Sequence, residues 1–356
     1  MRAMSGEQVT EAVAWCAAVL REAVGRDWRA VRAGRLEWDC HTTAVHVADD
    51  LVAYAANLAG RAQDAYLPFD LTLHEDTGNA DLLHVVETTG ALLAAAVQTA
   101  PPGLRAFHPY PFRSADRDGF AAMGVAEVLL HTHDMAEGLG LSYEPPAELA
   151  EAVLGTLFPH VRPGPEPWPT LLWATGRGEL PGRDPVTEWR WYNNLVLPTE
   201  RLVLTGLRPA NARDLVLGGD GGFDWIEGGP YEGTREAAGL LVKAYEAGVH
   251  RPEFTTFVAV REEDGRAVGA LLFHGVPDED GRVEIGYDLA EAARGQGYAT
   301  EALRALSAWA LARDDVRTLY ARAQKSNTAS QGVLGRAGFE PVGAIDDRLL
   351  AYELRS

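Results

Sequence analysis

The segment Arg294–Thr300, with the sequence RGQGYAT, constrains the fold of this 356-residue chain more than any other feature. It lies directly between a strand-like run, Val283–Leu289, and a helix-like run, Ala299–Ala312. Glycines let successive backbone N–H groups approach an anion, and the N-terminus of a helix adds the positive end of its dipole. We therefore predict a strand, a loop suited to a pyrophosphate and a helix, with an ordinary glycine-rich turn as the alternative.

The residues around this loop predict a mixed α/β domain. Short apolar runs that alternate like strands are separated by turn residues such as Glu-Asp-Gly, and a second helical run follows at Thr328–Arg336. Besides Val283–Leu289, the predicted strands are Arg201–Leu207, Thr255–Arg261, Ala267–His274, Arg317–Ala323, Phe339–Gly343 and Arg348–Leu354. This pattern of α and β elements begins near residue 197.

The residues before this point show helical periodicity and no strand-like alternation. Ser5 and Gln8 have the spacing of a capping box and open the first helix. Further helices are predicted at His41–Arg61, Asn79–Ala100 and Arg117–Leu139, which together suggest an all-α four-helix bundle. A Pro/Gly-rich segment, residues 163–185, follows them. We expect two domains, 1–196 and 197–356.

Composition limits the classes of partner. The formal net charge is −19, and acids outnumber bases in both halves of the chain. A nucleic-acid binder would carry a basic excess, whereas this field attracts a cationic or amine ligand. No run is apolar and long enough to span a membrane, and the N-terminus lacks the pattern of a signal peptide, so we expect a cytoplasmic protein with no membrane partner. Cys16 and Cys40 alone cannot form a disulfide framework.

The phosphate-loop region resembles the GNAT superfamily of acyl-CoA-dependent acetyltransferases. Arg294, Gly297 and Ala299 match its signature Arg/Gln-x-x-Gly-x-Gly/Ala, and the flanking stretches VEIGYDL (283–289) and NTASQGVLGRAGF (327–339) follow in the family's order. The segment TERLVL (199–204) is similar to the branch that contains ribosomal-protein N-terminal acetyltransferases. The resemblance implies an α/β GNAT fold with a mixed, mostly antiparallel sheet, acetyl-CoA as cofactor, and a small-molecule amine or a peptide N-terminus as acceptor.

The same resemblance implies which residues hold the cofactor. The loop backbone would bind the pyrophosphate, the end of the preceding strand would pair with the pantetheine arm, and the start of the last helix would touch that arm. For Asn327 the alternative is a helix N-cap, and both roles are compatible. In chain order the predicted cofactor-binding residues are Tyr287, Asp288, Leu289, Arg294, Gly295, Gln296, Gly297, Tyr298, Ala299, Thr300, Asn327 and Ser330.

N-acetylation needs a neutral amine, a base that accepts its proton, and donors that polarise the thioester carbonyl. Glu284 occupies a strand position where many GNAT members carry this base, and it would act directly or through water; a solvated strand residue is the alternative. The tyrosine acid that many members have on the last helix is absent here. The family fold implies that Phe223–Val249 shapes the acceptor pocket, with candidates Trp225, Glu227, Tyr231 and Glu232.

The helical half contains a candidate metal site. Glu127 and His131 are four residues apart and share one helix face, and His46 lies on another predicted helix. One His and a Glu-x-x-x-His pair form a three-ligand site with an open position, as in catalytic zinc centres. Such pairs also arise by chance, and an interior histidine is usually a core residue.

Three segments in this half resemble the N-terminal domain of mycothiol-dependent maleylpyruvate isomerase, one of the DinB-like metal-binding bundles. They are Trp38 with HVADDLVAY (46–54), EVLLHTHD (127–134) and LLWATGR (171–177). The resemblance implies a divalent metal, commonly Zn²⁺, on His46, Glu127 and His131, with His133 and Asp134 as supporting residues.

In that family the metal activates a low-molecular-weight thiol. Mycothiol is an actinobacterial thiol, and a chain with only two lysines, rich in Arg, Ala and Gly, is typical of GC-rich genomes such as those of actinobacteria. The isomerase's own small C-terminal domain is absent here, so isomerase activity does not carry over.

Three functions remain open from the sequence. The first is an acetyltransferase whose metal domain has a supporting role. The second is a bifunctional enzyme, with metal-dependent thiol transfer or isomerisation in the N-terminal half. The third is a non-catalytic sensor that binds acetyl-CoA.

Overall fold

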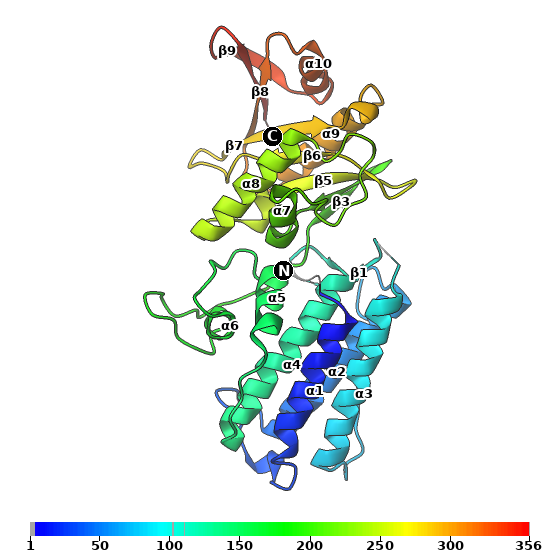
Figure 1. Ribbon diagram of the computed structural model, residues 1–356, viewed down its shortest axis with the longest axis vertical. Coiled ribbons are helices and arrows are strands. Elements are labelled where there is room, and N and C mark those ends of the chain that lie inside the picture. Colours follow the sequence, from blue (N-terminus) through cyan, green and yellow to red (C-terminus); the bar gives the residue numbers. More distant parts are fainter. Residues whose placement is uncertain (1–3, 102, 110, 356) are drawn as a thin grey trace. The chain divides into compact units, whose positions relative to one another are not determined.

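The computed structural model describes residues 4–101, 103–109 and 111–355. The chain divides into two compact units, Met1–Asn194 and Leu195–Ser356, drawn in Figure 1 and called here the first and second units. Each unit has a hydrophobic core of its own.

The first unit is built on long helices that pack against one another (Figure 1). α1 contacts α3 and α4, and α2 contacts the same two helices. α4 is the central element, because side chains on all its faces are buried. The sequence therefore predicted these helices correctly, and their bounds are α1 Gly6–Arg21, α2 Cys40–Gly60, α3 Asn79–Thr99 and α4 Arg117–Leu139.

Local chemistry explains where these helices begin and end. Ser5 and Gln8 form the predicted capping box at α1. The Asp39 side chain accepts the backbone N–H of Thr42 and thereby caps α2. α4 ends at Gly140, which adopts φ 63°, a left-handed conformation that suits glycine.

The expectation that the first half contains no strands was wrong. β1 (Arg105–Phe107) pairs in antiparallel fashion with β2 (Ser114–Asp116), and three-residue strands are too short to show alternation. Two shorter helices, α5 (Ala147–Leu157) and α6 (Pro167–Ala174), were also missed. α6 lies inside the Pro/Gly-rich segment and begins with proline, which is tolerated in the first turn of a helix.

The expectation that no run is apolar and long enough to span a membrane was also wrong for one helix. Among the described residues, α3 meets both criteria, with a mean hydropathy of 1.4. Core helices of soluble domains meet the same criteria, and α3 packs against α1, α2 and α4.

The second unit contains a mixed sheet in which the described strands follow the order β3-β4-β5-β6-β7-β8-β10-β9. Among these strands, β7 and β8 pair in parallel and the other neighbours are antiparallel, as predicted. The strands are β3 Val196–Pro198, β4 Leu202–Gly206, β5 Thr256–Arg261, β6 Ala267–Phe273, β7 Arg282–Leu289, β8 Thr318–Gln324, β9 Glu340–Ala344 and β10 Leu349–Arg355.

Helices complete this unit and also connect its strands. α8 contacts β5, β6 and β7, whereas α9 contacts β4, β7 and β8. The predicted helices after the loop and near the C-terminus are α9 and α10; α7 and α8 lie in a stretch for which no elements were predicted. Their bounds are α7 Pro209–Val216, α8 Glu232–Ala247, α9 Tyr298–Leu311 and α10 Thr328–Arg336.

β7 and β8 pair only along their first halves. The parallel register joins Arg282–Glu284 of β7 to Thr318–Tyr320 of β8. β7 nevertheless runs to Leu289 and β8 to Gln324, so the paired strands separate beyond Glu284 and Tyr320. A gap therefore opens in the sheet immediately before the glycine-rich loop.

Gly138 of α4 provides a test of the packing in the first unit. A Cβ added there would lie 2.0 Å from the backbone oxygen of Arg32, which cannot move like the end of a side chain. We expect Gly138→Ala to lower the free energy of unfolding by about 1–3 kcal/mol, despite the better helix propensity of alanine. Denaturation of the full chain followed by circular dichroism measures the change. Gly25→Ala, with no atom within 4 Å of the added Cβ, is the matched control; equal stability of both variants would contradict the packing.

Candidate functional sites

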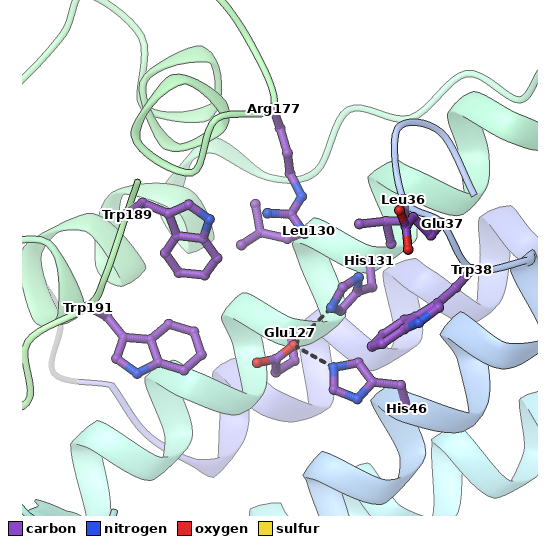
Figure 2. A pocket seen from close by; sticks show the side chains of 10 residues that line it. All are labelled: Leu36, Glu37, Trp38, His46, Glu127, Leu130, His131, Arg177, Trp189 and Trp191. Atoms are coloured by element: carbon purple, nitrogen blue, oxygen red, sulfur yellow. Dashed lines mark ion pairs between the residues drawn. The ribbon is translucent and has the colours of Figure 1, made fainter. Parts of the chain in front are cut away.

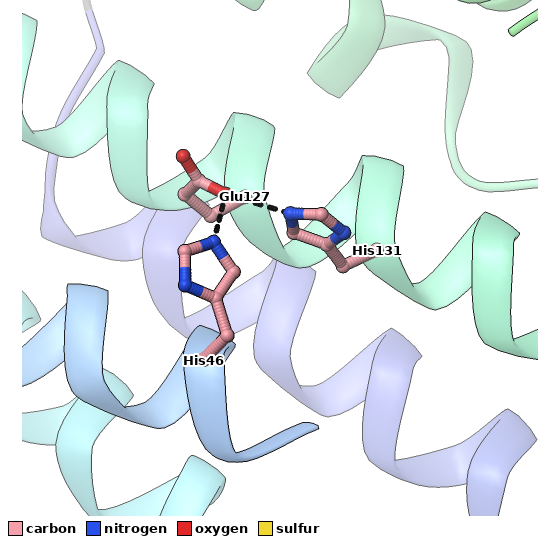
Figure 3. A group of neighbouring side chains, drawn as sticks. All are labelled: His46, Glu127 and His131. Carbon is pink, nitrogen blue, oxygen red and sulfur yellow. Dashed lines mark ion pairs between the residues drawn. The ribbon is translucent and has the colours of Figure 1, made fainter. Parts of the chain in front are cut away.

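The three predicted metal ligands meet in the first unit, as Figure 3 shows. His46 comes from α2, and Glu127 and His131 come from α4. Their ligand atoms all lie within 4.8 Å of one another. Oε2 of Glu127 is 3.2 Å from Nε2 of His131 and 3.8 Å from Nε2 of His46. Two imidazole nitrogens and a carboxylate oxygen therefore converge on one point.

Asp134 fixes the orientation of His131. Its Oδ2 lies 3.0 Å from Nδ1 of His131, and Arg177 donates from Nε and Nη2 to the same carboxylate at 3.0 and 2.9 Å. With Nδ1 engaged in this way, Nε2 faces Glu127. Burial alone would lower the pKa of His131, but hydrogen bonds with Asp134 and Glu127 outweigh it and raise the pKa to about 9.

The donor set fits a divalent metal. Two histidines and one carboxylate are ligands that zinc accepts, and a hydrogen bond from a ligating histidine to a carboxylate is the usual support of such a site. The side chains of Glu127 and His131 are only 12% and 9% exposed. His133, the other predicted supporting residue, instead packs its ring against Trp168 at 5.7 Å.

A cavity of about 420 Å³ opens beside this cluster. Figure 2 shows Trp189 and Trp191 on one side of it and Trp38 against His46 on the other. A small molecule could therefore reach the position that the three ligands leave open. The lining residues are Leu36, Glu37, Trp38, His46, Glu127, Leu130, His131, Arg177, Trp189 and Trp191.

In the second unit, the glycine-rich loop has the conformation that its sequence predicts. Gly295 and Gly297 adopt φ 76° and 86°, a region that disfavours side chains. Gly297 is the N-cap of α9 and no side chain caps the helix there. The first amides of α9 thus remain available to an anion, at the positive end of the helix dipole.

Arg201 and Glu301 hold this loop in place. Arg201 donates from Nη1 to the backbone oxygen of Gln296 at 3.0 Å. Glu301, in the first turn of α9, accepts from Thr199 Oγ1 at 2.6 Å and from the backbone N–H of Arg201 at 2.7 Å. Burial by itself raises the pKa of Glu301, but these hydrogen bonds outweigh it and leave the pKa lowered.

A second cavity, of about 250 Å³, lies where β7 and β8 separate. Three of the predicted cofactor residues, Tyr287, Asp288 and Ser330, line it. Asp288 contacts α8 through Thr234, whereas Tyr287 contacts α10 through Ser330, as expected of neighbouring strand residues that point to opposite faces. The wall therefore combines β6, β7, β8, α8 and α10.

The residues at the start of α10 have a structural role. The Asn327 side chain accepts the backbone N–H of Ser330 at 3.0 Å, so Asn327 is the N-cap. The Tyr287 hydroxyl lies 2.8 Å from Ser330 Oγ. Contact between Asn327 and a cofactor stays a prediction.

Glu284 does not line the second cavity among the described wall residues. Its carboxylate accepts a hydrogen bond from Nε of Arg322, on β8, at 2.7 Å. The acceptor candidates Trp225, Glu227, Tyr231 and Glu232 are also missing from this described wall, where Gly233, Glu236, Ala237 and Leu240 of α8 stand instead.

Sequence reasoning did not name three polar residues that line the second cavity. Glu236, His274 and Arg322 come from α8, from the residue after β6, and from β8. Each lies in a segment that was predicted: Glu236 in Phe223–Val249, expected to shape the acceptor pocket, His274 at the end of strand Ala267–His274, and Arg322 in strand Arg317–Ala323. No local pattern singled out the side chains themselves.

Comparison with known proteins agrees with this geometry. Residues 201–340 match the family model of the acetyltransferase (GNAT) domain. The matched GNAT domain contains the glycine-rich loop, Glu284 and the residues around the second cavity.

Two curated relatives are similar to part of this chain. The chain is 37% identical over 86 residues to "Uncharacterized N-acetyltransferase YjdG" of Bacillus subtilis (strain 168), covering 24% of this chain and 51% of that protein. It is 30% identical over 91 residues to "Uncharacterized N-acetyltransferase p20" of Bacillus licheniformis, covering 26% and 51%. The chain thus spans about half the length of the curated relatives that it matches.

Among solved structures, an acetyltransferase of the GNAT family from Bacillus anthracis is 17% identical, with a TM-score of 0.33. It covers 45% of this chain and 98% of its own. The assignment of residues 201–340 rests on the family model.

Glu301→Gln tests the loop anchor. Near neutral pH we expect a loss of about 1 kcal/mol in the free energy of unfolding, modest because the Arg201 side chain is 45% exposed and its charge is screened. Because folding lowers the carboxyl pKa, the stabilisation is present above the ordinary value of 4.5 and disappears as pH falls through the lowered value. Denaturation curves across acid pH measure it; Glu340→Gln, exposed on β9, is the control. A difference that persists in acid would contradict the anchor.

Proposed function

We propose that residues 197–356 form a domain that transfers the acetyl group of acetyl-CoA to an amine, either of a small molecule or of a peptide N-terminus. The observation that carries this proposal is the uncapped glycine-rich loop at the start of α9, placed directly after the strand that separates from β8. An anion-binding loop beside a gap in the sheet suits a long phosphorylated ligand whose reactive end enters the gap.

The chain's own residues would bind this cofactor in three places. Backbone N–H groups of Gln296–Thr300 bind the pyrophosphate, with Arg294 nearby. The unpaired edge of β7 at Tyr287–Leu289 hydrogen-bonds to the pantetheine arm, because beyond Glu284 this edge no longer pairs with β8. Ser330, which lines the second cavity, and Asn327, which caps the same helix, would contact that arm from α10. When bound, acetyl-CoA supplies an activated acyl group on sulfur.

The acidic wall supports an amine acceptor. Glu236 and Asp288 line the second cavity, and Arg322 is paired with Glu284 rather than free. Carboxylates attract an ammonium group and oppose an anionic acceptor. The Glu284 carboxylate promotes loss of the amine proton, directly or through an intervening group.

For the first unit, we propose a DinB-like domain, residues 1–196, that binds a divalent metal. The proposed metal is Zn²⁺. His46, Glu127 and His131 would be its protein ligands, and the bound metal would lower the pKa of a thiol or water at its open position. The 420 Å³ cavity beside the cluster leaves room for a small thiol such as mycothiol.

This cavity favours a second candidate, a bifunctional enzyme with metal-dependent thiol transfer or isomerisation in the first unit. The cavity lies directly beside the three proposed ligands, where a thiol or substrate would meet the metal. A sensor that binds acetyl-CoA without turnover is the remaining alternative, and the acetylation assay below separates it from an enzyme.

Gly297→Ala tests the cofactor site. A side chain at φ 86° strains the loop and obstructs the approach of a phosphate to the amides. We expect the Kd for acetyl-CoA, measured by isothermal titration calorimetry, to rise at least about tenfold, which corresponds to ~1.4 kcal/mol. Gly265→Ala, also at positive φ (71°) with open space around it, is the control.

The same protein should release CoA thiol from acetyl-CoA when supplied with an acceptor. The panel comprises aminoglycosides, peptides with a free N-terminal Ser or Ala, and cysteine conjugates of thiols. Acetylation of at least one member, reduced in Glu284→Gln, supports the proposal. Tight acetyl-CoA binding with no acetylated product would favour the sensor, and an unchanged Kd in Gly297→Ala would contradict the site.

Metal binding should release a proton. Because the pKa of His131 is raised to about 9, its imidazole is charged at neutral pH and must lose its proton to become a ligand. Zn²⁺ affinity should therefore fall as pH decreases below about 9, by up to about tenfold per pH unit. Calorimetry in buffers of different ionisation enthalpy counts the proton. His46→Ala should lose the metal, and His84→Gln, whose side chain is 81% exposed, should keep it; wild-type protein that binds no Zn²⁺ would refute the site.

A further inference from the structure

We propose that the imidazole of His274 accepts the proton of the acceptor amine, and that Glu284 acts as a positioning residue for this histidine. The inference rests on the proposed acetyl transfer and names the group through which Glu284 works. It makes His274 the catalytic base of the second cavity.

The position of His274 carries the inference. His274 directly follows β6. Its backbone N–H donates to the backbone oxygen of Glu284 at 2.9 Å, which holds the two residues side by side across the sheet. Nε2 of His274 lies 4.0 Å from Oε1 of Glu284. His274 lines the cavity with a side chain that is 35% exposed, so an acceptor can reach it.

Gly286 makes room for this imidazole. A Cβ at Gly286 would lie 2.9 Å from Nε2 of His274, so any side chain there would displace the ring. Gly286 is also the second residue of β7 beyond the last pair with β8. The ring therefore lies over the strand where the gap opens, which is where the proposed acyl group must meet the amine.

The two carboxylates of β7 are less suited to be the base. Glu284 is bound by the Arg322 guanidinium at 2.7 Å, and a carboxylate in such a charge-assisted bond is a poor proton acceptor. Asp288 uses Oδ1 to accept from Thr234 at 2.9 Å, and its Oδ2 is fully buried. Both carboxylates of β7 are thus already engaged by a neighbouring side chain, whereas the imidazole of His274 lines the cavity.

Carboxylates predominate among the charged groups around His274. Asp288 lines the cavity from β7 and Glu236 lines it from α8, Glu284 lies beside His274, and Arg322 on β8 is paired with Glu284. An imidazolium formed during the reaction therefore meets a net negative surrounding. Histidine is the side chain most often used as a general base near neutral pH.

The proposed step balances as follows. The neutral amine nitrogen forms a bond to the thioester carbon, the carbon–sulfur bond breaks, and CoA leaves as thiolate. The amine proton passes to the unprotonated imidazole nitrogen of His274. Solvent then removes that proton, and the thiolate takes one from solvent.

The test compares full-length wild type, His274→Gln and Glu284→Gln by CoA-thiol release with the acceptor panel named above. We expect His274→Gln to lower kcat at least about 100-fold with little change in KM for acetyl-CoA. Glu284→Gln should keep the acid limb of the pH–rate profile but move it to lower pH, because the imidazolium loses a neighbouring negative charge. Added imidazole should partly restore His274→Ala, and His84→Gln should behave as wild type.

Circular dichroism and the Kd for acetyl-CoA confirm that each variant is folded. If Glu284→Gln abolishes the acid limb while His274→Gln keeps the wild-type profile, Glu284 is the base and the inference is overturned. A His274→Gln defect confined to KM, or no rescue by imidazole, overturns it as well. Wild type that binds acetyl-CoA but acetylates nothing overturns the proposed function first, and the inference with it.

Discussion

The separation of β7 from β8 is the constraint on which the second unit's site depends. As far as Glu284 and Tyr320 the two strands share the hydrogen bonds of a parallel sheet. Beyond that point the facing backbone groups need other partners, because unpaired polar groups are costly when water is excluded. The second cavity, the loop that follows β7 and the contact of Tyr287 with α10 all lie at this divergence.

In the first unit, the candidate metal site depends on a series of side chains of alternating charge. Arg177 binds Asp134, Asp134 binds His131, and His131 faces Glu127. An isolated buried charge would be strongly destabilising, so each member depends on the next. The arrangement holds Nε2 of His131 toward Glu127 and His46, which is the orientation that a metal ligand requires.

Parts of both sites could be predicted because they depend on residues close in sequence. The spacing of Glu127 and His131 placed them on one face of α4, and the glycines of the loop predicted its left-handed backbone. His274 and Arg322 were missed because they reach the cavity from neighbouring strands. Strand register depends on pairing between distant segments. The sequence around Glu284 therefore does not predict its hydrogen bond with Arg322.

The sequence by itself determined the type of most elements, their caps and the capacity of residues 294–300 to present backbone amides, because hydrophobic period, capping and glycine content act within a few residues. Only the tertiary structure decided that β6, β7 and β8 lie together, that β7 and β8 part after Glu284, and that His274 rather than Glu284 faces the gap. These features arise from contacts between residues far apart in the chain, and their energy depends on packing and register that no local pattern contains.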